Sequence, residues 1–149
     1  MLSGIKERRE QRLLWQSQGN TLMLTMFDKD GNVIGTTGYP RIALANNSAE
    51  FGIIIHHPYW GKSYSTEAHL LGLELGFETL KFNRVEFVTQ SINTPMRRFF
   101  EKYGCVLEGI TRQASFQNGT FLDLCTYSIL KDEWPAVKSK LLASIKKSS

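Results

Sequence analysis

The sequence lacks several features that mark membrane, metal-binding or disulfide-bonded proteins. No apolar run approaches the length needed to span a bilayer, and the N-terminus has no hydrophobic region like that of a signal peptide. The chain has only two cysteines, Cys105 and Cys125, and their spacing fits no metal site. Both fall in expected strands, so we expect buried free thiols, no bound metal and a reducing, cytoplasmic environment.

A strong charge of one sign is also lacking, since the formal net charge is only +4. Much of this excess lies in the C-terminal lysines Lys138, Lys140, Lys146 and Lys147, a pattern typical of a solvated helix face. A nucleic-acid-binding module would rest on this net charge alone, because no strand interleaves aromatic and basic residues. No repeat, low-complexity segment or linker divides the 149 residues, so we expect a single domain over residues 1–149.

The stretch from Glu50 to Lys81 organises the rest of the chain. The β-branched run Ile53–Ile55 predicts a buried strand, and His57–Gly61 breaks the pattern with a proline and a glycine. Helical spacing begins at Ser65, with Ser65 or Thr66 as the expected N-cap. Two apolar rows should pack broadly against a sheet: Ala68, Leu71 and Leu75 in one, and Leu70, Leu73, Phe77 and Leu80 in the other.

The remaining segments alternate between helical and strand patterns. Turn signals at Asp28–Asn32 and at Asn118-Gly119 predict two hairpins. We expect helices at 5–18, 96–103 and 132–147, and strands at 21–27, 33–39, 84–89, 105–116 and 120–130. This order predicts a mixed sheet with helices packed on it, an α+β or α/β domain.

A loop of small polar residues that opens a helix is an anion site on physical grounds. The first N–H groups of a helix lack carbonyl partners and carry partial positive charge. Lys62 adds a full positive charge to this loop. The expected anion is a pyrophosphate, and an ordinary strand–loop–helix unit without a ligand is the alternative.

At these residues the chain resembles a known family. The string Tyr59–Ala68, YWGKSYSTEA, resembles the acetyl-CoA-binding motif of the GNAT acetyltransferases, above all the branch that acetylates ribosomal-protein N-termini, where YWGKGYATEA is typical. Ser63 and Ser65 replace the usual glycine and small residue, so we expect Ser63→Gly to tighten cofactor binding through positive φ and closer backbone approach. Glu101–Gly109 and the hairpin that follows also resemble the family, and the match covers residues 5–134.

The resemblance implies a GNAT fold, with a mixed, mostly antiparallel sheet flanked by helices, and acetyl-CoA as co-substrate. It also implies the residues that hold acetyl-CoA: backbone groups of Ile54, Ile55 and His56 along the pantetheine, Trp60, Gly61, Lys62, Ser63, Tyr64 and Ser65 around the pyrophosphate, and Asn93 from the other side.

Glu50, at the start of the strand, is the best candidate for the base that takes the amine proton, the alternative being a surface carboxylate. His56 and His57 are expected to be phosphate neighbours or surface residues. A general acid is missing, because the family places a tyrosine or a serine where this chain has Phe100 or Met96. Tyr103 lies one helical turn along and, by its spacing, is expected to point elsewhere.

We therefore expect an acetyl-CoA-dependent N-acetyltransferase that acts on a primary amine of a small molecule or a protein N-terminus, by direct attack in a ternary complex. The alternative is a degenerate GNAT-fold protein that binds CoA or only a partner. The front of the chain has no counterpart of the family's first strand and helix. We expect this to leave an exposed sheet edge, and either a homodimer through that edge or a monomer with an open acceptor cleft.

Overall fold

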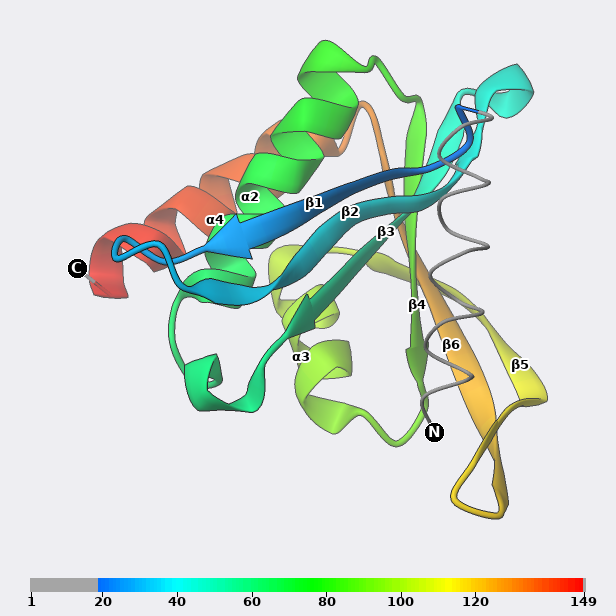
Figure 1. Cartoon of the computed structure of the whole chain (residues 1–149). Coiled ribbons are helices and arrows are strands. Elements are labelled where there is room, and N and C mark those ends of the chain that lie inside the picture. The colour runs from blue at the N-terminus through cyan, green and yellow to red at the C-terminus, as the bar shows by residue number, and fades with distance from the viewer. Residues whose placement is uncertain (1–18, 149) are drawn as a thin grey trace.

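The computed structural model describes residues 19–148, and the helix expected at 5–18 lies outside these residues. One sheet of six strands has the order β1-β2-β3-β4-β6-β5 (Figure 1). The strands are β1 (Leu22–Phe27), β2 (Val33–Ala43), β3 (Ser48–Ile55), β4 (Arg84–Gln90), β5 (Val106–Gln117) and β6 (Thr120–Leu130). The helical elements are η1 (Leu44–Asn46), η2 (His57–Tyr59), α2 (Tyr64–Glu74), η3 (Leu75–Thr79), α3 (Thr94–Tyr103) and α4 (Trp134–Ser148).

The sheet consists of two antiparallel parts joined by one short parallel contact. β1, β2 and β3 pair antiparallel, and so do β4, β6 and β5. β3 and β4 run parallel but pair only over Ser48–Glu50 and Arg84–Glu86, after which the two strands diverge (Figure 1). The predicted mixed, mostly antiparallel sheet is confirmed.

Both predicted hairpins form, and their turn residues explain why. Asp28 Oδ1 accepts hydrogen bonds from the backbone N–H groups of Asp30 and Asn32, each at 2.9 Å. Asn118 and Gly119 both have positive φ, 50° and 77°, as a two-residue hairpin turn requires.

The three described α-helices pack on one face of the sheet, around a single apolar core. The core joins Phe51 and Phe87 of the strands to Leu73 of α2, Phe100 of α3 and Leu141 of α4. In Figure 1, α2 and α4 lie side by side, and Lys138 Nζ of α4 contacts carboxylate oxygens of Glu74 and Glu78 at 2.7 and 2.8 Å.

Two glycines let α2 and the π-helical turn η3 approach the sheet closely. A Cβ at Gly72 would lie 2.3 Å from Phe51 Cε2, and a Cβ at Gly76 would lie 2.0 Å from Tyr39 Oη. The Tyr39 hydroxyl donates to the carbonyl of Gly72 at 2.7 Å, and its ring contacts Phe51 and Phe82 edge-on. Burial raises the pKa of Tyr39, so this hydroxyl keeps its proton.

The structure corrects some boundaries and one member of each apolar row. Leu71 of one row and Leu80 of the other are 64% and 38% exposed. With Ala68 and Leu75, Leu71 lines an open cavity between α2 and the strands β1 and β2. The helix begins at Tyr64, with Ser63 rather than Ser65 or Thr66 at the N-cap. Cys105 precedes β5 and is only half-buried, whereas Cys125 lies buried in β6 as expected.

Within residues 19–148, every helix is too short or too polar to cross a bilayer.

Candidate functional site

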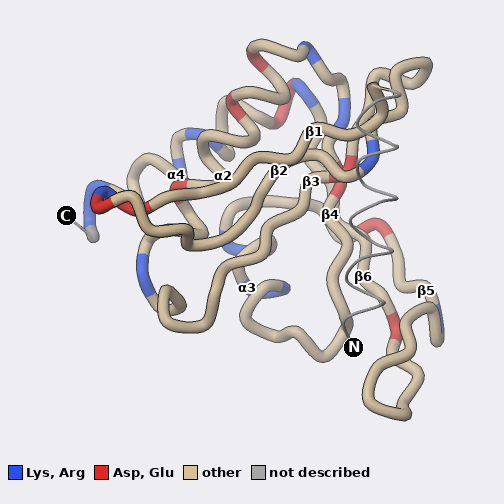
Figure 2. Tube along the Cα trace, viewed as in Figure 1, with Lys and Arg blue, Asp and Glu red and all other residues tan. Residues whose placement is uncertain are grey.

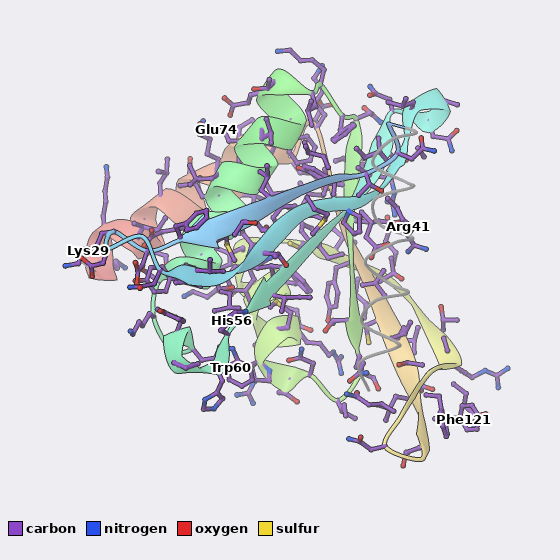
Figure 3. All side chains as sticks on the ribbon, in the orientation of Figure 1. Lys29, Arg41, His56, Trp60, Glu74 and Phe121 are labelled. Atoms are coloured by element: carbon purple, nitrogen blue, oxygen red, sulfur yellow. The ribbon has the colours of Figure 1, made fainter. Side chains whose placement is uncertain are left out.

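A cavity of about 570 Å³ opens where β3 and β4 diverge. It is bounded by the end of β3, the loop that follows, the start of α2 and the start of α3. Figure 3 labels His56 at the end of β3 and Trp60 in the loop beyond it. The lining residues are Ile53, Ile54, Ile55, Tyr59, Trp60, Gly61, Lys62, Ser65, Asn93, Pro95, Met96 and Phe99. Seven of these twelve residues were predicted from the resemblance: Ile54, Ile55, Trp60, Gly61, Lys62, Ser65 and Asn93.

The pairing of β3 with β2 decides which backbone groups of β3 face this gap. The N–H of His56 donates to the carbonyl of Ile34 in β2 at 2.9 Å. Because hydrogen-bonding directions alternate along an antiparallel strand, the backbone groups of Ile54 and the N–H of His56 face β2, and Ile53 and Ile55 turn theirs toward the gap. The carbonyl of His56 accepts a hydrogen bond from the N–H of Tyr59 at 2.9 Å. The predicted use of Ile54 and His56 backbone groups is therefore wrong, while Ile55 stays a candidate. Ile53 was missed, because the alternation is known only once the register is known.

The loop after β3 is held in place by its aromatic residues. Trp60 Nε1 donates to the carbonyl of Ile55 at 2.7 Å, and the His57 ring lies against the indole with 4.8 Å between ring centres. Lys62 Nζ sits 5.3 Å from the centre of the Tyr59 ring, within cation–π range. Gly61 has a φ of 74°, so the loop needs a glycine at this point.

The start of α2 presents its first N–H groups beside this loop. The N–H of Glu67 is the first to bond back, to the carbonyl of Ser63 at 3.0 Å, so the N–H groups of Tyr64, Ser65 and Thr66 precede the helical ladder. The Ser63 hydroxyl donates to the Glu67 carboxylate. Ser63 has a φ of −68°, in the right-handed region that any residue adopts, so the serine itself does not use the positive φ that Ser63→Gly would allow.

Asn93 closes the opposite wall of the cavity and caps α3. Its side chain accepts a hydrogen bond from the N–H of Met96 at 3.3 Å, as the predicted N-cap role requires. This bond satisfies one of the free N–H groups at the start of α3, which borders the gap.

A second cavity of about 250 Å³ adjoins the first and reaches Glu50. The two cavities share Ile53, Ile54, Asn93 and Met96. Figure 2 shows the diverging halves of β3 and β4 in tan, without charged residues. Glu50 is the charged residue among those that line the second cavity. Its side chain is 17% exposed and is paired with Arg41. The guanidinium reaches only carboxylate oxygen Oε2, with Nε at 2.6 Å.

The structure offers no hydroxyl at the positions where the family has a general acid. Met96 lines both cavities, and Phe100 is buried against the Phe87 ring. The Tyr103 hydroxyl donates to Ser144 Oγ on α4 at 2.7 Å, so it points away from the gap as expected. Burial acts to raise the pKa of Tyr103, but hydrogen bonds with Ser144, Thr66 and Lys102 outweigh it and lower the pKa.

One polar residue near the site, His69 of α2, was not singled out in the sequence. It lines the second cavity, and only 2% of it is exposed. Burial lowers the pKa of the imidazole to about 4, against the opposing effect of the Ser65 carbonyl beside Nδ1. A signal was present, because a histidine in the predicted buried stretch of this helix must find a polar partner or face a polar space.

Comparison with known proteins identifies the class to which this fold and site belong. The sequence profile of the acetyltransferase (GNAT) domain matches residues 3–106, so the chain belongs to the GNAT acetyltransferase family, as the resemblance implied.

Relatives from bacilli agree with this assignment. N-acetyltransferase p20 of Bacillus licheniformis is 30% identical over 80% of this chain and 66% of its own length. YdaF of Bacillus subtilis, named as a candidate ribosomal N-acetyltransferase, is 33% identical over 73% of this chain and 60% of its own. The chain thus spans less than two thirds of the length of these relatives.

A solved structure has the same fold. A GCN5-related N-acetyltransferase from Brucella melitensis superposes with a TM-score of 0.75 at 33% identity, over 83% of this chain and 57% of that one.

The residues at the gap fit acetyl-CoA, the co-substrate that the family implies. The inward-facing backbone groups of Ile53 and the N–H of Ile55 suit the amides of an extended pantetheine arm, while the Ile55 carbonyl accepts from Trp60 Nε1. The α2 N-terminus and Lys62 suit a pyrophosphate. The mostly apolar lining between them suits the aliphatic parts of the arm.

Proposed function

We propose that this chain is an acetyl-CoA-dependent N-acetyltransferase that acts on a primary amine, with a protein N-terminus as one acceptor class. The observation that carries the proposal is the continuous gap between β3 and β4. At one end it presents a helix N-terminus and Lys62, and at the other it presents the Glu50 carboxylate. An anionic cofactor and an amine can therefore enter from different ends and meet between the strands.

Acetyl-CoA supplies an activated acyl group on a thioester, and the protein positions it and handles the proton. The N–H groups at the start of α2 bind phosphate, and the inward-facing N–H groups of β3 orient the carbonyl groups of the arm. The attacking amine must lose a proton, and the Glu50 carboxylate, paired with Arg41, can accept it directly or through a water. The thiolate leaves without a protein acid, since Met96 and Phe100 carry no exchangeable proton.

Cofactor binding is tested first by calorimetric titration with acetyl-CoA. Lys62→Gln should weaken binding several-fold, because it removes one charge beside the expected phosphates. Lys131→Gln removes the same charge from an exposed position after β6 and should leave affinity unchanged. If the parent protein is folded and shows no heat at millimolar acetyl-CoA, the proposal fails.

Transfer is tested by thiol release from acetyl-CoA with short peptides and with polyamines as acceptors. Glu50→Gln should lower turnover by about 10²-fold, the usual worth of a general base, with acetyl-CoA affinity nearly unchanged. Glu86→Gln is the matched control, because Glu86 also pairs with an arginine, Arg84, but does not line either cavity. Full turnover by the Glu50 variant across pH 6–9 would remove this residue from the mechanism.

The second candidate, a GNAT-fold protein that binds CoA without efficient transfer, is favoured by one observation. The nearby tyrosine hydroxyl, that of Tyr103, donates to Ser144 Oγ of α4. Acetyl-CoA binding without amine-dependent thiol release would support this candidate over the first.

A further inference from the structure

His69 is a buried polar residue that the proposed mechanism leaves without a role. Its ring is enclosed by Phe51, Phe87, Phe99 and Phe100, with ring centres 5.3, 6.1, 4.5 and 6.1 Å away. A polar ring in such a position needs partners for both nitrogens, because an unsatisfied buried group is costly.

The contact of Nδ1 fixes where the ring hydrogen lies. Nδ1 is 2.7 Å from the carbonyl oxygen of Ser65, one turn earlier in α2. A carbonyl oxygen can only accept, so Nδ1 carries the hydrogen and donates it. Because burial keeps the imidazole neutral near pH 7, Nε2 is left with a free electron pair that can accept a hydrogen bond.

The surroundings of Nε2 show that it opens into the second cavity. Among the described residues no hydrogen bond reaches Nε2, and in the same part of the chain no fully buried side-chain nitrogen or oxygen lacks a partner. Nε2 must therefore be accessible, although the residue as a whole is almost entirely enclosed. His69 lines the cavity that also contains Glu50, Thr89 and Asn93, so this electron pair faces the space where the proposed reaction takes place.

We propose that His69 Nε2 accepts a hydrogen bond from an N–H group of a substrate bound between β3 and β4. This inference rests on the proposed function, and the N–H group belongs either to the acceptor amine or to an amide of the pantetheine arm. The imidazole orients its ligand rather than taking the proton, which goes to Glu50. A hydrogen bond from one N–H of an amine would direct the nitrogen's own electron pair toward the acyl carbon.

The first test is ¹⁵N NMR of the protein labelled at its three histidines, with His69→Gln used to assign the His69 signals. In the free protein, Nδ1 should be protonated and Nε2 unprotonated. A move of the Nε2 resonance on addition of desulfo-CoA alone would assign the hydrogen bond to the pantetheine. A move only when a pool of short peptides or polyamines is added as well would assign it to the amine. A protonated Nε2, or no move with any addition, would overturn the proposal.

Two substitutions separate a ligand contact from a structural one. In His69→Gln the side-chain oxygen can reach the position of Nε2, and in His69→Asn the amide can keep the bond to the Ser65 carbonyl but cannot reach the cavity. The proposal expects the Gln variant to stay within a few-fold of the parent and the Asn variant to lose about tenfold in kcat/KM. A purely structural role would instead make the Asn variant at least as active and as heat-stable as the Gln variant.

Failure of the proposed function would look different from failure of this inference. If the parent protein releases no thiol with any amine, the proposed transfer fails, and the response of Nε2 to desulfo-CoA and the amine pools still decides the role of His69.

Discussion

Substitution of Gly76 by alanine should destabilise the protein through a single contact with Tyr39. The new Cβ would lie 2.0 Å from Tyr39 Oη and 2.8 Å from Cζ, so the buried ring must move by more than about 1 Å to reach ordinary contact distance. That movement would also break the hydroxyl's 2.7 Å bond to the carbonyl of Gly72.

The magnitude follows from three effects. Overpacking costs about 1–3 kcal/mol and the lost hydrogen bond about 1 kcal/mol, whereas alanine recovers at most about 1 kcal/mol of helix propensity. We expect Gly76→Ala to lower the free energy of unfolding by about 1–3 kcal/mol, measured by urea denaturation. Gly109→Ala is the control, because its Cβ would meet nothing within 4 Å.

A double-mutant cycle identifies the contact. Tyr39→Phe alone should cost about 1 kcal/mol, and in that background Gly76→Ala should cost less than it does in the parent, because the clashing oxygen is gone. Additive costs, within about 0.5 kcal/mol, would refute the argument that this hydroxyl limits the size of residue 76.

Two further predictions concern residues at the site. Asn93→Ala should lower the free energy of unfolding by about 1 kcal/mol through loss of the cap on Met96, and Asn93→Asp should retain the cap, as chemical denaturation of both variants would show. For His69, the pKa is about 4 in the folded protein against 6.5 when exposed, so the unfolded chain binds a proton first as the pH falls. Stability should therefore decline from about pH 6.5 to about pH 4, by up to about 3 kcal/mol, and His69→Gln should flatten this part of the pH profile of denaturation midpoints.

Local patterns were sufficient to predict most of the fold. Asn118-Gly119 has few alternatives to a tight hairpin turn, and Asn93 two residues before Pro95 is a strong helix start, so both were predicted from nearby residues alone. The exposure of Leu71 was not predictable in this way. Leu71 borders an open cavity between α2 and the strands β1 and β2, and such a cavity depends on how elements distant in the sequence pack.

The candidate site was predicted in its loop and less well in its strand. Lys62 and Gly61 lie in a continuous motif, so both the type of each residue and its place in the loop can be read from the sequence. The choice between Ile53 and Ile54 instead depends on the pairing of β3 with β2, since a shift of one residue reverses every backbone direction. His69 could not be recognised from local sequence, because its surroundings are four aromatic rings from three other elements, β3, β4 and α3, and the cavity beside them.

The gap itself follows from how the two halves of the sheet are held. β3 is committed to β2 as far as Ile55 and β4 to β6 as far as Gln90, yet the two strands share only the short pairing that ends at Glu50 and Glu86. Beyond that point the rings of His69 and Phe99 pack against each other, with 4.5 Å between ring centres, and each lines one of the two adjoining cavities. His69 therefore belongs both to the packing on the helix side of the sheet and to the lining of the proposed site. A large truncation at this position would change both at once, which is why the tests at His69 compare side chains of similar polarity.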